Sequence, residues 1–168
     1  MTHLAKVLVV SDSLARGERE DLAGPALRSR LEAAGLAVVE VRAVPDGASW
    51  VEGALRALSG GFTGLIVTTG GTGFSPRDQT PEGTLAALER EAPGLAEAMR
   101  LASPLGRLSR ARAGTLGRAL VLNLPGSPRG ALECLEAVIE VVPHALDLLG
   151  GGDAPHPPET GGSTATSS

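Results

Sequence analysis

Aromatic side chains are almost absent from this sequence of 168 residues. It contains no tyrosine, two phenylalanines and one tryptophan, so aromatics make up 2% of the chain. Proteins that bind single-stranded nucleic acids use aromatic rings on which bases stack, and the formal net charge of −4 adds no attraction to a phosphate backbone. We therefore expect no nucleic-acid partner, and a core built from alanine, valine, leucine and isoleucine.

Cysteine and long apolar runs are scarce as well. Cys134 is the single cysteine, which excludes a disulfide within the chain and a cluster of thiolate metal ligands. No stretch approaches the roughly 20 apolar residues of a membrane helix. The start, MTHLAKVLVVSDS, lacks the length and the cleavage site of a signal peptide. The composition thus predicts a soluble cytoplasmic protein that does not bind membranes.

The residues that are present predict a globular domain followed by a polar tail. Hydrophobic residues make up 42% of the chain and charged residues 20%, which is enough to bury a core. From about Gly150 the sequence GGGDAPHPPETGGSTATSS has almost nothing to bury. We expect one domain over residues 1–150 and a disordered tail without catalytic residues over 151–168.

Apolar segments and helical segments alternate along the domain. Residues 104–117 are less regular and predict an antiparallel strand or hairpin that leads into the last strand. Continuous apolar strands separated by helices predict an α/β fold with a mostly parallel sheet covered on both faces. The predicted strands are 5–11, 36–44, 64–69 and 118–124, and the predicted helices are 22–34, 48–59, 81–92, 94–103 and 128–149, the last interrupted by Pro143.

Glycine-rich turns follow two of the predicted strands, at the sheet edge where ligands bind in such folds. In GGTGFSPRD the glycines of 70–73 can take positive φ and leave their N–H groups uncovered. Thr80 is the expected N-cap of the next helix and Pro81 its first residue; in NLPGSPRG, Ser127 and Pro128 repeat this pattern. Two helix N-termini beside glycine turns are typical of a phosphate site.

Carboxylates stand in the same loops. Asp12, Asp46 and Asp78 each follow a different strand, and they would repel a phosphate unless a cation lies between them. Mg²⁺ is held by one or two carboxylates together with substrate phosphates, so Asp46 and Asp78 are candidate ligands and Asp12 a third. Arg77 and Arg129 add positive charge. This combination favours phosphoryl or nucleotidyl transfer.

Each feature also fits a purely structural interpretation. A glycine turn between a strand and a helix need not bind anything, and the fingerprints GxGxxG and GxxxxGK[ST] are both absent. Asp46 in VPDG is an ordinary turn residue, Asp12 is a possible cap, and Arg77 with Asp78 is a possible surface ion pair. Cys134 fits a small core residue.

Four segments together resemble the MogA/MoaB family of molybdenum cofactor biosynthesis: TTGGTGFSPRDQTPEGT at 68–84, PGLAEAMR at 93–100, LSRARAG at 108–114 and NLPGSPRGALECL at 123–135. The resemblance covers about residues 4–149. It implies a three-layer α/β/α fold assembled as trimers or hexamers. It also implies Mg²⁺-dependent transfer of an adenylyl group from ATP to molybdopterin with release of pyrophosphate, and a possible partner in the metal-inserting enzyme of the pathway.

The resemblance also implies roles for individual residues. Asp46 and Asp78 match acidic residues that we assign to Mg²⁺ and catalysis. Ala23 stands where the family commonly has serine, so a hydroxyl contact to the ligand is missing there, and Ser13 stands where the family often has arginine. The residues expected to bind substrate or nucleotide are Asp12, Thr69, Gly70, Gly71, Thr72, Gly73, Ser75, Arg77, Ser109, Arg110, Pro125, Gly126, Ser127 and Pro128.

Two other functions remain open at this stage. Some branches of the family bind molybdopterin without a clear catalytic role, and more distant relatives hydrolyse nucleotide-like compounds. The latter resemble GGLGPT followed by two aspartates, whereas this chain has GGTGFSPRD. The sequence leaves open trimer against hexamer, molybdenum against tungsten, and ATP against another nucleotide.

Overall fold

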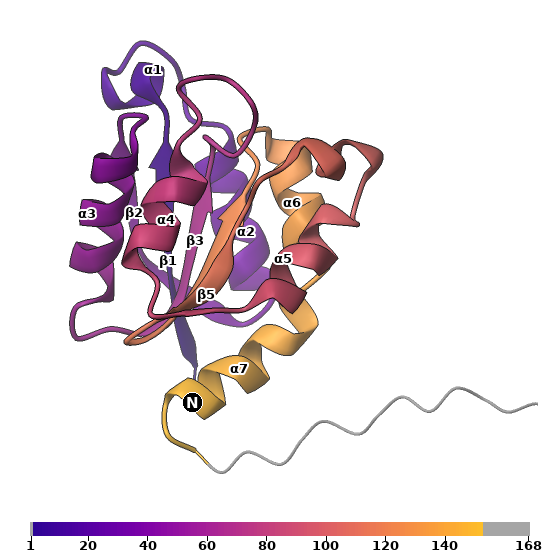
Figure 1. Cartoon of the computed structure of the whole chain (residues 1–168). Coiled ribbons are helices and arrows are strands. Elements are labelled where there is room, and N and C mark those ends of the chain that lie inside the picture. The colour runs from indigo at the N-terminus through magenta and orange to yellow at the C-terminus, as the bar shows by residue number, and fades with distance from the viewer. Residues whose placement is uncertain (1, 153–168) are drawn as a thin grey trace, which may run out of the picture.

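The computed structural model describes residues 2–152, which form a sheet between two layers of helices (Figure 1). The tail predicted for 151–168 lies outside the described residues from position 153 onward. No helix within residues 2–152 is long and apolar enough to span a membrane. The strands are β1 (His3–Val10), β2 (Leu36–Val44), β3 (Thr63–Thr69), β4 (Arg90–Glu91), β5 (Ala113–Leu116) and β6 (Arg118–Leu124). The helices are α1 (Asp12–Ala15), α2 (Ala23–Ala33), α3 (Ala48–Ser59), α4 (Thr80–Ala87), α5 (Pro93–Arg100), α6 (Pro128–Glu136) and α7 (Val142–Leu149), with 3₁₀-helices η1 (Pro104–Leu108) and η2 (Ile139–Val141).

The sheet is mostly parallel, with the strand order β2-β1-β3-β6-β5-β4. β1 pairs in parallel with β2 and β3, and β3 pairs in parallel with β6. β5 and β4 extend the sheet in antiparallel fashion at one edge. The predicted α/β fold is confirmed, and so is a hairpin leading into β6, although its first strand is confined to Ala113–Leu116.

The two faces of β1 show how the core is divided. Ala5, Val7 and Val9 pack on the side covered by α2, α5, α6 and α7, whereas Leu8 and Val10 pack on the side of α3 and α4. All five are at most 3% exposed, because successive side chains of a central strand point to opposite faces and both faces are covered. This two-sided burial fixes the positions at which the central strands end.

The helix predicted over residues 81–92 is wrong in its second half. α4 ends at Ala87, and Leu88 takes an extended conformation with φ −62° and ψ 137°. The N–H of Glu89 donates to the carbonyl of Thr115 at 2.9 Å, and Arg90–Glu91 pair with β5. The open edge of the sheet thus supplies hydrogen bonds that outweigh the helical propensity of this segment.

The long helix predicted over 128–149 is also divided earlier than expected. α6 ends at Glu136, the 3₁₀ turn η2 follows, and Pro143 lies in the first turn of α7. A proline is tolerated there because a first-turn N–H has no partner within the helix. The proline therefore begins a helix instead of breaking one.

Candidate functional site

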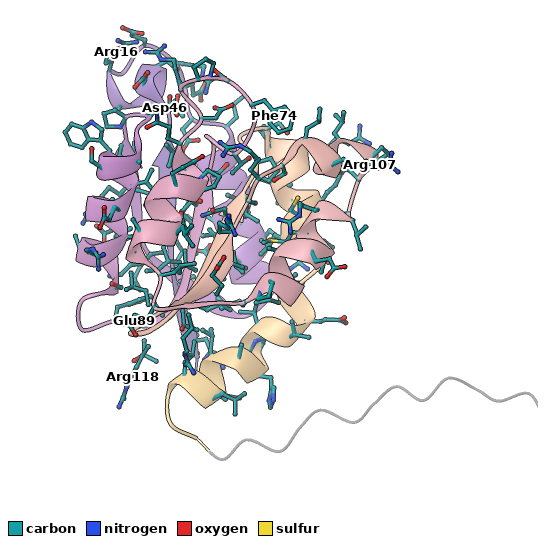
Figure 2. The ribbon with its side chains drawn as sticks, viewed as in Figure 1. Arg16, Asp46, Phe74, Glu89, Arg107 and Arg118 are labelled. Atoms are coloured by element: carbon teal, nitrogen blue, oxygen red, sulfur yellow. The ribbon has the colours of Figure 1, made fainter. Side chains whose placement is uncertain are left out.

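The loops after the parallel strands meet at one end of the sheet. The strand order reverses between β1 and β3, the position at which doubly wound sheets bind ligands. A pocket of about 580 Å³ opens there, lined by the ends of both strands at Val10 and Thr69. We call it pocket A. Figure 2 shows Asp46 at this end of the molecule, with Glu89 and Arg118 at the opposite end.

The first glycine turn forms one wall of pocket A and has no room for side chains. Gly70 and Gly71 have φ of +104° and +67°, values that only glycine adopts readily. A Cβ on Gly70 would lie 2.3 Å from the carbonyl oxygen of Val10, and one on Gly71 would lie 2.3 Å from Oγ1 of Thr80. The backbone of this turn is therefore pressed against its neighbours, with its other side facing the pocket.

Thr80 fixes this turn to the start of α4, although not as the predicted N-cap. The N-cap is Gln79, and Thr80 is the first helical residue. Its Oγ1 donates to the carbonyl of Gly70 at 2.8 Å, and its N–H donates to the carbonyl of Gly71 at 3.0 Å. The prediction of a helix beginning beside the glycines is correct. The hydroxyl of Thr80 does not cap that helix; it is fully buried and donates to a carbonyl of the turn.

The second glycine turn packs directly on the first. The hydroxyl of Ser127 accepts a hydrogen bond from the N–H of Gly130 at 3.1 Å, so Ser127 is the N-cap of α6 as predicted. A Cβ on Gly126 would lie 3.3 Å from Cα of Gly70. Oγ1 of Thr69 donates to the carbonyl of Pro125 at 2.7 Å. The two turns form one continuous wall with the N-terminus of α6 beside it.

Asp12 and Asp46 lock two loops together. The N–H of Asp12 donates to Oδ2 of Asp46, and the N–H of Asp46 donates to Oδ1 of Asp12, both at 3.1 Å. The other oxygen of Asp12 pairs with the guanidinium of Arg77. Asp12 therefore positions Asp46 and does not itself line pocket A, whereas Oδ1 of Asp46 lies toward Gly71.

The electrostatic environment of Asp46 suits a cation. Partial burial raises the pKa of the Asp46 carboxyl, and the nearby charges of Asp12 and Asp78 raise it further, against hydrogen bonding from Asp12 and the charge of Arg77. Asp78 lines the same pocket; its Oδ2 accepts from the N–H of Ser75 at 3.0 Å. Two like charges that face one pocket raise each other's energy, and a divalent cation between them relieves that repulsion.

The donor set fits Mg²⁺ bound together with phosphates. Within residues 2–152 no group of three or more histidine, cysteine, aspartate or glutamate side chains is arranged to hold a metal alone. Mg²⁺ needs only one or two carboxylates when substrate phosphates and water complete its shell. Asp46 and Asp78 supply that number, next to turns whose amides suit phosphate.

The two arginines predicted to bind substrate are turned to other partners. Arg110 donates from Nε to the carbonyl of Gly73 at 2.9 Å and from Nη2 to that of Asp78 at 2.6 Å, and its Nη1 pairs with Glu82. Its guanidinium thereby holds the segment 73–78 in place from outside pocket A. Arg77 is exposed and pairs with Asp12.

A second pocket, of about 640 Å³, lies across the wall formed by the turns. We call it pocket B. It shares Ser127 with pocket A and is lined by Thr72, Ser109 and Pro125. The 3₁₀-helix η1 contributes apolar side chains, among them Leu105 and Leu108. Two cavities of different polarity thus meet at the glycine turns.

The predicted site residues divide between these places. Ser75 lies in an open hollow beside Phe74 and Asp78. The β1–α2 connection supplies lining residues that were not predicted, Arg19 above all. The one available signal was the position of this connection, after a strand that ends at the site. In pocket A lie Thr69, Gly70, Gly71, Asp46, Asp78, Gly126, Ser127 and Pro128; in pocket B lie Thr72, Ser109, Pro125 and again Ser127; Asp12, Gly73, Arg77 and Arg110 line neither.

A network of hydrogen bonds around one buried asparagine connects the elements that carry the site. Asn123, at the end of β6, is fully buried. Its Nδ2 donates to Oγ1 of Thr68 at 3.0 Å and to Oγ1 of Thr84 at 2.9 Å. Its Oδ1 accepts from the N–H of Arg112 at 3.0 Å. One amide side chain thus ties together β3, α4 and the segment that carries Ser109.

Comparison with known proteins covers the whole of this region. Residues 6–144 match the family described as "Probable molybdopterin binding domain". The molybdopterin adenylyltransferase of Helicobacter pylori is 39% identical over 152 residues, which cover 86% of this chain and 86% of that protein.

Solved structures agree with the sequence comparison. The molybdopterin biosynthesis enzyme MoaB from Thermus thermophilus superposes with a TM-score of 0.83 at 48% identity, covering 89% of this chain and 97% of that one. The molybdopterin biosynthesis Mog protein from Mycobacterium ulcerans gives 0.80 at 41% identity, covering 88% and 99%. The family match at 6–144 includes every residue that lines pockets A and B.

Proposed function

This chain belongs to the family of probable molybdopterin-binding domains, and on that basis we propose that it is a molybdopterin adenylyltransferase of molybdenum cofactor biosynthesis. The name of the Helicobacter relative supports this reaction class. The observation that carries the proposal is the placement of Asp46 and Asp78 in one pocket with both glycine turns. That arrangement suits the phosphates of a nucleotide bound with a divalent cation.

The proposed reaction joins two phosphates. An oxygen of the molybdopterin phosphate bonds to the α-phosphorus of ATP. The bond from that phosphorus to the oxygen bridging to the β-phosphorus breaks, and its electron pair leaves with pyrophosphate. The products are adenylyl-molybdopterin and pyrophosphate. The protein contributes position and charge stabilisation, as is usual in phosphoryl transfer.

The two pockets suit the two substrates. Pocket A carries the carboxylates, so we assign to it the triphosphate of ATP; Asp46 and Asp78 would hold Mg²⁺, which neutralises phosphate charge when bound. Pocket B is more apolar, with Leu105 and Leu108 in its lining, so we assign to it the pterin. The shared wall, which includes Ser127, then lies beside the reacting phosphates.

Assembly and location follow as parts of the same proposal. Leu101 and Leu105 are 78% and 76% exposed, and exposed leucines on neighbouring turns favour a contact between copies of the chain. We propose a homo-oligomer, a trimer with a hexamer as the alternative, in the cytoplasm where ATP is supplied. The metal-inserting enzyme of the pathway is the proposed recipient of the product.

The test is pyrophosphate release that depends on molybdopterin, measured on wild type and on Asp78→Asn. This change removes one negative charge from pocket A, and we expect kcat/KM to fall by about a hundredfold or more because charge stabilisation in the transition state is lost. Asp147→Asn is the matched control, since Asp147 lies on α7 and pairs with His3.

Full activity of Asp78→Asn would contradict the proposed mechanism. Molybdopterin binding by the wild type without any pyrophosphate release would contradict the enzyme itself and favour a non-catalytic, pterin-binding role.

A further inference from the structure

Arg19 lies in the connection between β1 and α2 and lines pocket A. The same stretch contributes Glu20 and Asp21 to the lining. Counting these with Asp46 and Asp78, four acidic residues and one arginine line the pocket. Such a pocket attracts a metal ion but repels the outer phosphates of a nucleotide. The single positively charged side chain is therefore important in offsetting the negative electrostatic potential there.

The other arginines near the site already have partners. Arg77 pairs with Asp12, Arg110 with Glu82, and Arg129 with Glu133. Arg19 differs, because no side chain within residues 2–152 forms an ion pair or hydrogen bond with its guanidinium. A polar head that lines a pocket without a partner is available to a ligand.

Arg16, three residues earlier, provides the contrast. Its Nε pairs with Oε1 of Glu18 at 3.1 Å, and it does not line pocket A. Figure 2 shows Arg16 at the outer tip of the molecule, beyond the end of the sheet at which Asp46 lies. Two arginines of one exposed segment thus differ in both position and pairing.

The segment that carries Arg19 is loosely packed. α1 has no buried residue, and residues 15–20 are all exposed. Backbone hydrogen bonds hold its first part, among them the N–H of Glu18 donating to the carbonyl of Ser13 at 2.8 Å. Because few apolar contacts hold it, the segment adjusts at low cost, and the long side chain of Arg19 can follow a ligand.

We propose that Arg19 binds the β- and γ-phosphates of the nucleotide, the part that leaves as pyrophosphate. The assignment rests on the proposed adenylyl transfer. In such a transfer the attacking and leaving oxygens lie roughly in line on opposite sides of the α-phosphorus. The attacking phosphate comes from pocket B, which Arg19 does not line. A residue that lines pocket A alone therefore flanks the leaving group, where negative charge grows as the bond breaks.

The test compares Arg19→Gln with Arg16→Gln in the full chain. Two measurements are made with Mg²⁺ present: calorimetric titration with pyrophosphate and with AMP, and molybdopterin-dependent turnover at varied ATP. We expect Arg19→Gln to weaken pyrophosphate binding and to lower kcat/KM for ATP, each by about tenfold to a hundredfold, which is typical for a lost hydrogen bond to a charged group. AMP binding should not change, and Arg19→Lys should fall in between because it keeps the charge but not the planar fork.

The outcomes separate this inference from the reaction it rests on. Equal pyrophosphate affinity in Arg19→Gln and Arg16→Gln, or none in the wild type, overturns the role of Arg19. An equal loss of AMP and pyrophosphate binding also overturns it, because the change would then act on the whole pocket. A wild type that releases no pyrophosphate with molybdopterin refutes adenylyl transfer, whereas the titration with pyrophosphate still decides whether Arg19 binds phosphates.

Discussion

Replacing Gly71 by alanine tests whether the first glycine turn is both tightly packed and required for ligand binding. Gly71 has φ +67°, and its added Cβ would lie 2.3 Å from Oγ1 of Thr80 and 3.5 Å from Oδ1 of Asp46. The matched control is Gly61→Ala. Gly61 has φ +64°, and its Cβ would meet nothing within 4 Å.

The two substitutions share one cost and differ in another. A left-handed conformation costs an L-residue about 1–2 kcal/mol, and both variants incur it. Gly71→Ala must also push Thr80 away, at about 1–3 kcal/mol for the overlap, and it breaks the 2.8 Å bond from Thr80 to Gly70, worth about 0.5–1.5 kcal/mol. We therefore expect a loss of about 3–6 kcal/mol in the free energy of unfolding for Gly71→Ala, against about 1–2 kcal/mol for Gly61→Ala.

Urea denaturation of both variants beside the wild type gives the free energies, and calorimetric titration with Mg-ATP gives the affinities. The turn that moves is the one assigned to phosphate, so Gly71→Ala should also weaken Mg-ATP binding by about tenfold or more, while Gly61→Ala should not change it. Equal stability of the two variants would refute the packing argument. A destabilised Gly71→Ala with unchanged Mg-ATP affinity would refute the assignment of the turn.

Two further predictions concern buried groups. Asn123→Ala removes the partner of two buried hydroxyls and of the part-buried N–H of Arg112, and it should lower the free energy of unfolding by about 3 kcal/mol or more. Thr84→Ser keeps its hydroxyl and should cost less than about 1.5 kcal/mol. Equal losses in urea denaturation would show that the network is not stabilising. Burial, with a smaller effect of Glu133, raises the pKa of the Cys134 thiol, so less thiolate is present at any pH below that pKa. A thiol reagent at pH 8 should therefore react more slowly with the folded protein than with the protein in urea, and equal rates would contradict this.

The sequence predicts the parallel half of the fold well because its strands are continuous apolar runs. The run around Leu65 and Val67 has to be buried on both faces whatever its neighbours are. The end of α4 was not predictable in this way. Glu89 leaves the helical pattern only because Thr115, distant in the chain, offers a carbonyl at the sheet edge. Local propensity carries no information about such a partner.

For the candidate site, too, the sequence predicts which residues meet but not which distant partners their side chains bind. The rule that parallel strands end at one edge is enough to bring Asp46 and Asp78 to the same pocket. The direction of a long side chain is different: Arg110 points to the carbonyls of Gly73 and Asp78, and that choice depends on the folded loop. Arg19 was not predicted for the same reason: it lies on a loop without a periodic pattern, so its sequence does not show where its side chain points.

The side chains of Asp12 and Asp46 each accept a hydrogen bond from the backbone N–H of the other, so each aspartate holds the other's backbone in place. A substitution at Asp46 removes a proposed metal ligand and at the same time releases the segment that begins at Asp12 and carries Arg19. Its effect on turnover therefore mixes two losses, and only a double-mutant cycle with Arg19 separates them. The same linkage works in reverse: a ligand that draws Asp46 into place lowers the entropy of that segment. Amide hydrogen exchange in residues 12–22 should then slow when a divalent cation alone is added, without nucleotide.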